Sequence, residues 1–107
     1  MYIYNITFNV DKSIEKEWLD FIKRQFIPKM LKSGLLKSSL TSKIMVDEVQ
    51  GNSYSIQFAA DNKADLKQFI DQELYPILNE FHLKLRPKMV YFATELDVID
   101  RQKKDAK

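Results

Sequence analysis

Residues 2–10 alternate in hydrophobicity, with a large apolar side chain at every even position (Tyr2, Tyr4, Ile6, Phe8 and Val10). A period of two places successive side chains on opposite faces of a β-strand. The pattern therefore predicts a strand whose even-numbered face is buried, with Ile3, Asn5, Thr7 and Asn9 on the other face.

The period changes after Asp11, where apolar residues recur at spacings of three and four and predict a helix to about Leu31. Trp18 lies on the apolar side of this helix and is expected in the core. Pro28 removes a backbone donor and should interrupt the regular helix about one turn earlier. Gly34 provides the stop signal.

Two further strands follow, one over residues 35–48 and one over residues 53–60, joined by a turn at Gln50-Gly51-Asn52. In the first of them we expect Leu36, Leu40, Ile44 and Val46 to face the core, and Ser39, Thr41, Lys43 and Met45 to face away. In the second, the buried face is predicted to hold Tyr54, Ile56, Phe58 and Ala60.

A second helix is predicted to begin after an Asn62 cap and to end at Arg86-Pro87, with a proline at Pro76. Its apolar stripe comprises Leu66, Phe69, Ile70, Leu74, Ile77, Leu78, Phe81 and Leu85. Residues 88–99 then alternate again and predict a last strand.

The two helical segments repeat each other at an offset of 48 residues, and both follow the pattern Φ-x-x-Phe-Ile-x-x-x-Φ-Φ-Pro-x-Φ, where Φ is apolar. The order β-α-β-β-α-β with such a repeat predicts an α+β, ferredoxin-like fold. Right-handed crossovers place both helices on one face of a four-stranded antiparallel sheet with strand order 4-1-3-2.

The 107 residues are predicted to form one domain, residues 1–100, followed by a disordered basic tail, residues 101–107. The tail carries four basic residues and one acidic residue, which leaves residues 1–100 with a net charge of −1. Without a basic excess on the folded part, nucleic acid is not expected as a partner. No apolar run approaches the roughly 18 residues of a membrane span. The absence of cysteine fits a cytoplasmic location.

The sheet face without helices is expected to be half-buried, because its two central strands offer only neutral groups such as Asn5, Thr7, Ser55 and Gln57. The edge strands are expected to add residues that include Lys43, Met45, Met89, Tyr91 and Glu95. This face predicts a homodimer in which two sheets enclose a common interior. A monomer with a mildly polar face is the alternative.

Several segments together resemble a family of short bacterial proteins of unknown function, in the dimeric α/β-barrel class of ferredoxin-like folds. They are Tyr2-Ile3-Tyr4-Asn5-Ile6-Thr7, Glu17-Trp18-Leu19, Ile27-Pro28, Leu31…Gly34 and Tyr54-Ser55-Ile56-Gln57-Phe58. Relatives often carry His just before Ile-Pro, where this chain has Phe26. The resemblance implies a dimer. The class includes cofactor-free monooxygenases, haem-degrading enzymes, lactone isomerases and proteins without known activity.

Asn5 is the strongest candidate for a polar anchor, because the strand asparagine of the class's small oxygenases would correspond to it. His82, the only histidine, would correspond to their histidine, while Trp18 lies in the helix core. Thr7, Gln57 and Tyr91 complete the candidate ligand-binding set. Alternatively, Asn5 is a structural amide bonded to Ser55 or Gln57, and His82 borders the apolar stripe.

The leading hypothesis is a homodimer that is non-enzymatic or binds a small hydrophobic or aromatic ligand, with no cofactor and no metal. The alternative is a cofactor-free monooxygenase, haem-handling enzyme or isomerase that uses the space near Asn5. An RNA-binding domain of the same topology is a remote alternative, because the third strand offers Ser55 and Gln57 rather than exposed aromatic side chains.

Overall fold

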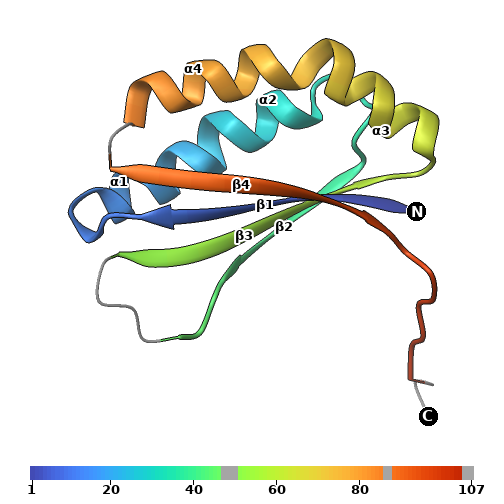
Figure 1. Cartoon of the computed structure of the whole chain (residues 1–107), viewed down its shortest axis with the longest axis horizontal. Coiled ribbons are helices and arrows are strands. Elements are labelled where there is room, and N and C mark those ends of the chain that lie inside the picture. The colour runs from blue at the N-terminus through green and yellow to red at the C-terminus, as the bar shows by residue number, and fades with distance from the viewer. Residues whose placement is uncertain (47–50, 86–87, 105–107) are drawn as a thin grey trace.

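The structure is a computed structural model that describes residues 1–46, 51–85 and 88–104. These residues form four strands and two long helical segments (Figure 1). The strands are β1 (Tyr2–Val10), β2 (Ser38–Lys43), β3 (Asn52–Ala60) and β4 (Met89–Asp97). The first helical segment comprises η1 (Lys12–Ile14), α1 (Glu15–Phe21), η2 (Ile22–Phe26) and α2 (Ile27–Leu31). The second comprises α3 (Lys63–Phe69), η3 (Ile70–Leu74) and α4 (Tyr75–Leu85).

The sheet is antiparallel with strand order β2-β3-β1-β4, and both helical segments cover the same face (Figure 1). This is the predicted ferredoxin-like arrangement, with β1 and β3 at the centre. The predicted Asn62 cap is present, and Asp11 caps the first helical segment. Asp11 Oδ1 accepts from the Ser13 backbone N–H at 2.8 Å, and Asn62 Oδ1 accepts from that of Asp65 at 2.8 Å.

The core lies between the helices and the even-numbered residues from Tyr4 to Val10 and from Tyr54 to Ala60, which are buried as the sequence predicted. Phe8 is at its centre, with its ring centroid 5.3 Å from that of Trp18 and 5.6 Å from that of Phe81. Edge-to-face contacts of this kind add to the free energy gained by burial. Trp18 is fully buried, which confirms its predicted structural position.

Both helical segments contain a five-residue π-helical turn immediately before the proline-bearing α-helix. In the first segment, the backbone N–H of Ile27 donates to the carbonyl of Ile22, five residues earlier. A proline ring clashes with the carbonyl four residues before it, and the wider π turn relieves that crowding at Pro28 and Pro76. The two turns are offset by 48 residues, so the sequence repeat is also a repeat of backbone geometry.

β2 is shorter than the predicted strand over residues 35–48. Its pairing runs from Ser38 opposite Ala59 to Lys43 opposite Tyr54, and residues 47 and 48 of the predicted strand lie outside the described residues. Gly51 has the positive φ, 80°, that was expected of the turn. Gln50, the predicted helix stop at Arg86-Pro87 and residues 105–107 of the tail lie outside the described residues.

In β2 and β4 the side chains lie on the opposite faces to those predicted. The register with the central strands decides which side chains share a face, and the sequence pattern does not contain it. On β2, Leu40 lies opposite Gln57 and therefore faces away from the helices, whereas Thr41 lies opposite Ile56 and faces them. On β4, Tyr91 lies opposite Phe8, on the helix side. Met89, Ala93, Glu95 and Lys43 also belong to the helix side, contrary to expectation.

Residues 98–104 follow β4 without helix or strand. In Figure 1 this segment leaves the end of β4 toward the side of the sheet that carries no helix. The backbone N–H of Val98 donates to the carbonyl of Met1 at 3.1 Å, and Ile99 is 87% exposed. No helix in the described part of the chain combines the length and the apolar character that crossing a membrane requires.

Candidate functional site

The open face, meaning the sheet face that no helix covers, is the surface where the sequence predicted function. Register assigns the following strand residues to it: Ile3, Asn5, Thr7 and Asn9 of β1; Ser38, Leu40 and Ser42 of β2; Ser53, Ser55, Gln57 and Ala59 of β3; Val90, Phe92, Thr94 and Leu96 of β4. None of these strand residues carries an ionisable side chain. Solvated sheet faces usually carry many lysines and glutamates, and this face differs from them in composition.

A hydrogen-bonded polar group occupies the two central strands of the open face. Ser55 Oγ donates to Asn5 Oδ1 at 2.6 Å, and Asn5 Nδ2 donates to Thr7 Oγ1 at 3.2 Å. Farther along the strands, Asn9 Nδ2 donates to Ser53 Oγ at 3.2 Å. The first two bonds fix the orientation of the Asn5 amide, as expected for a half-buried polar group. The predicted partnership of Asn5 with Ser55 is confirmed.

The outer strands of the open face carry large apolar side chains. Leu40 of β2 is 62% exposed, while Val90, Phe92 and Leu96 of β4 are 62%, 63% and 39% exposed. The sequence pattern did not reveal these residues, because it predicted Leu40 on the core face and Met89, Tyr91 and Glu95 of the last strand on the open face. The open face is thus a neutral polar strip bordered by apolar edges, and it is more apolar than the sequence predicted.

Two shallow hollows lie along the open face on either side of Asn5 in the strand register. One, of about 130 Å³, is lined by Thr7, Asn9, Ser53 and residues 90–92. The other, of about 440 Å³, is lined by residues that include Ile3, Leu40, Gln57, Ala59 and Val98. Thr7 and Gln57 therefore contribute to hollows on the expected face. Closing either hollow requires a second surface.

Tyr91 and His82 lie on the opposite side of the sheet from Asn5. The Tyr91 ring centroid is 5.7 Å from that of Phe8 and 5.9 Å from that of His82, beneath α4. Placing Tyr91 on the open face was therefore wrong, and the structure does not bring His82 together with Asn5. His82 Nδ1 is buried and has no hydrogen-bond partner among the described residues. His82 is thus half-buried at the border of the apolar stripe, the structural alternative expected from the sequence.

A second polar cluster joins the start of α1 to the start of β3. The Tyr54 hydroxyl donates to Glu15 Oε2, and Asn52 Nδ2 donates to the same oxygen at 2.8 Å. Burial and the bond to Glu15 raise the pKa of Tyr54 to about 12. The bond from Tyr54 is the largest cause of a lowered pKa at Glu15, and nearby Lys43 contributes less.

This cluster links residues 37 and 39 positions apart, so no local sequence signal revealed it. Tyr54 is 4% exposed and contacts Trp18, with ring centroids 4.9 Å apart. A tyrosine whose pKa lies far above neutrality holds its proton, and the cluster therefore fastens α1 to β3 rather than exchanging protons.

The chemical capacity of the open face follows from its groups. Hydroxyl and amide side chains accept and donate hydrogen bonds but do not ionise near neutral pH, so they orient a ligand without transferring protons themselves. Within the described residues, no cluster of three or more His, Asp or Glu side chains has the geometry of a metal site. Tyr54 and Phe58 of β3 are buried, so the third strand presents no aromatic platform for bases.

Comparisons with known proteins agree with this architecture. The profile of the family described as "Domain of unknown function (DUF4286)" matches residues 1–99. A dimeric ferredoxin-like protein from an uncultured marine organism has a TM-score of 0.72 and 11% identity, over 94% of this chain and 97% of that one. An EthD family protein from Bacillus halodurans has a TM-score of 0.63 and 10% identity, over 88% of this chain and 97% of that one.

SnoaB from Streptomyces nogalater, a cofactor-independent oxygenase, was compared as a mutant and gives a TM-score of 0.67 and 9% identity, over 96% of this chain and 98% of that one. A search among curated proteins found no match. At these identities, the likeness to solved structures concerns the fold alone.

Proposed function

The chain belongs to the DUF4286 family, and from that premise we propose that it acts as a homodimer that binds a small ligand. The two open faces pack against each other, and the ligand lies between the sheets beside Asn5. The observation that carries this proposal is the open face itself, which has no ionisable strand residue and exposes Leu40, Val90 and Phe92.

Burial of the apolar edges supplies the driving force for association. Phe92 is 63% exposed, and covering a phenylalanine to that extent contributes roughly 1–2 kcal/mol per copy. Because a two-fold axis presents the same patch twice, each such residue contributes on both sides of the interface. The fold shared with a dimeric ferredoxin-like protein supports the same assembly.

The polar strip determines the ligand chemistry. Ser55 and Thr7 hold the amide of Asn5 in place, so its orientation is set before a ligand arrives. A preorganised amide between apolar borders suits a small hydrophobic or aromatic molecule with one hydrogen-bonding group, such as a phenol or a carbonyl. Thr7 and Gln57 are further polar contacts along the same strip.

Catalysis in the same space is the second candidate function. It is favoured by the position of Asn5 on a central strand, in a fold shared with a cofactor-independent oxygenase. An oxidisable aromatic substrate would then be oriented by Asn5 and react with dioxygen. Binding is the better-supported function, because His82 lies on the other side of the sheet and no described strand residue of the open face supplies a general base.

Sedimentation equilibrium of the wild-type protein at micromolar concentration tests the assembly, and we expect a dimer. A thermal-shift screen with haem, flavin and small aromatic compounds tests the ligand. A ligand at 100 times its Kd stabilises the native state by about 2.7 kcal/mol. We expect a hit that is lost in Asn5→Leu but retained in Asn79→Leu, a matched change at an exposed helical position.

A purely monomeric protein would contradict the proposed assembly. If the protein is a dimer but Asn5→Leu and Asn79→Leu affect the ligand hit equally, the result would contradict the role of Asn5. The proposed dimer would still stand. Oxygen consumption in the presence of a confirmed ligand, abolished by Asn5→Leu, would favour the oxygenase over the binding protein.

A further inference from the structure

A third hollow lies on the helix side of the sheet, with Leu96 of the open face among its lining residues. The chain must return from α4 to the start of β4, so α4 covers that end of the strand and Met89 is 2% exposed. Toward the other end of β4 no helix lies above the strand, and Ala93, Glu95 and Asp97 are exposed. The fold thus leaves a gap between α3 and the last residues of β4.

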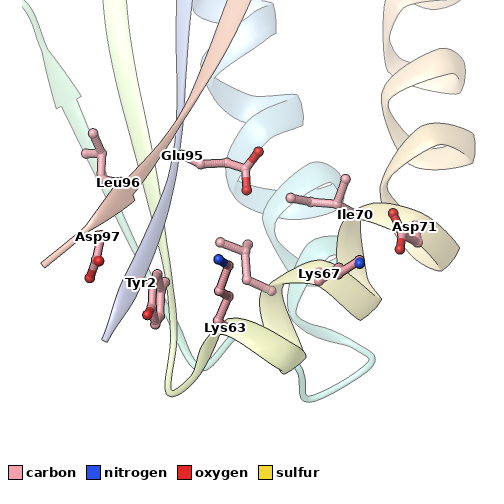
Figure 2. A pocket seen from close by; sticks show the side chains of 9 residues that line it. Tyr2, Lys63, Lys67, Ile70, Asp71, Glu95, Leu96 and Asp97 are labelled. Atoms are coloured by element: carbon pink, nitrogen blue, oxygen red, sulfur yellow. The ribbon is translucent and has the colours of Figure 1, made fainter.

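This gap is a cavity of about 440 Å³, seen from close by in Figure 2. Its apolar part comes from Leu66, which is 2% exposed, from Ile70 and from the ring of Tyr2. Its charged part comes from both walls, with Lys63, Lys67 and Asp71 on the helical side and Glu95 and Asp97 on the strand side.

Lys63 and Glu95 extend into the hollow from opposite walls, as Figure 2 shows. The two side chains form no ion pair with each other; the ion pairs among the described residues join Arg24 to Asp20 and Lys29 to Glu80. A cation and an anion therefore face the same space across an apolar floor without forming an ion pair with each other.

The position of Glu95 directs its carboxylate inward. Glu95 lies opposite Tyr4 in the register of β1 and β4, and Tyr4 is 7% exposed. Burial raises the pKa of Tyr4, and the charge of Glu95 adds to that effect. The carboxylate thus acts on a buried neighbour across the helix side of the sheet.

We propose that this hollow binds a zwitterionic ligand of amino-acid size with an apolar side chain. Its ammonium group pairs with Glu95, its carboxylate pairs with Lys63, and its side chain packs on Leu66 and Ile70. A hollow that presents charges of opposite sign favours a ligand that carries both signs, because a simple anion would meet Glu95 and Asp97 and a simple cation would meet Lys63.

The hollow is on the helix side, so it remains accessible when two open faces pack together. Binding here is independent of the proposed dimer and of Asn5. The full-length protein is therefore the appropriate sample in either oligomeric state.

Isothermal titration with leucine and phenylalanine tests the site, with N-acetyl-leucine and leucinamide as analogues that lack one of the two charges. We expect saturable binding of the amino acids with Kd at or below about 1 mM, and at least tenfold weaker binding of both analogues. Glu95→Gln and Lys63→Gln should each weaken binding at least tenfold. Glu73→Gln and Lys23→Gln, at exposed helical positions outside the hollow, should leave binding unchanged.

Equal binding of the amino acids and the blocked analogues would overturn the proposal, as would the absence of saturable heat at ligand concentrations up to about 10 mM. In either case, the charges are an ordinary solvated rim. Retained circular dichroism of each variant identifies a change in binding as a local effect. A protein that fails to dimerise but still binds leucine would separate this inference from the proposed function.

Discussion

Phe92 lies directly opposite Thr7 across the β4–β1 pair, on the face of the sheet that no helix covers. Its ring is 63% exposed although the neighbouring strands offer only uncharged side chains on that face. Exposed aromatic residues are enriched, and charged residues depleted, where proteins bind each other. The pairing of these two residues therefore links the strand register to the proposed dimer.

Replacement of Phe92 by Lys tests that link. The substitution removes apolar area and places two like charges at a symmetric interface, so we expect the dimer dissociation constant to rise at least tenfold, equivalent to about 1.4 kcal/mol. Sedimentation velocity over a concentration series measures the change.

Tyr75→Lys is the matched control, because Tyr75 is 77% exposed on α4, on the helix side of the molecule. It should leave the dimer intact. Equal weakening by both substitutions would show that association uses a surface other than the open face.

Gly51 should tolerate no side chain. A Cβ at this position would overlap the carbonyl oxygen of Val10, and its φ of 80° disfavours any other residue. We expect Gly51→Ala to lower the free energy of unfolding by about 2–4 kcal/mol, measured by urea denaturation. Gly34→Ala has a similar φ, 78°, but nothing within 4 Å of the added Cβ, and should cost about 1 kcal/mol. Equal costs at the two glycines would refute the steric argument.

Glu15 should make the free energy of unfolding depend on pH in the acid range. Its pKa is lowered in the folded protein, chiefly by the bond from Tyr54, so the stabilisation is fully present above the ordinary value of 4.5 and is lost as the pH falls through the lower folded value. After discounting for solvent screening, the effect is on the order of 0.5–1 kcal/mol. Urea unfolding from neutral pH down to the folded pKa should show a flatter profile for Glu15→Gln. Glu17→Gln, on the same helix, should retain the wild-type profile.

Tyr54 should make the free energy of unfolding fall as the pH rises in the alkaline range. Its pKa is raised from 10.0 to about 12 in the folded protein, because burial and Glu15 disfavour the phenolate. The stabilisation is therefore complete below pH 10.0 and disappears as the pH rises toward 12. Phenolate absorbance and urea unfolding across this range should show the loss in wild type and a smaller loss in Tyr54→Phe, where the raised pKa of Tyr4 still contributes. Tyr75→Phe, at an exposed tyrosine, should lose stability at alkaline pH as the wild type does. If Tyr75→Phe reduces that loss as much as Tyr54→Phe does, Tyr54 is not the source of the loss.

The buried faces of β1 and β3 could be predicted because nearly all the large apolar groups of each strand lie on one side, with Ile3 as the exception. Ile6 and Phe58 alternate with Thr7 and Gln57, and a period of two allows one solution when one face must be buried. The helix prolines were informative for a similar reason. Pro28 and Pro76 act through the backbone of their own helix, so their effect is local.

The candidate site was predicted in part. Asn5, Thr7 and Gln57 lie on central strands with a clear pattern, and they occupy the expected face. Tyr91 was misplaced because β4 has apolar residues on both faces, Met89 and Tyr91 on one and Val90 and Phe92 on the other. The hydrophobic pattern of such a strand fits either face toward the core, and only its register with β1 decides which face is buried.

The sequence by itself determined the order of elements, the sheet topology and the buried faces of the two central strands, because local periodicity and chain connectivity fix these features. The tertiary structure decided what lies on the edges. It turned Leu40 and Phe92 outward, moved Glu95 to the helix side and joined Glu15 to Tyr54. These outcomes depend on hydrogen bonding between segments distant in the chain, which no local pattern records. The open face and the hollow between α3 and β4 are therefore features of the folded protein.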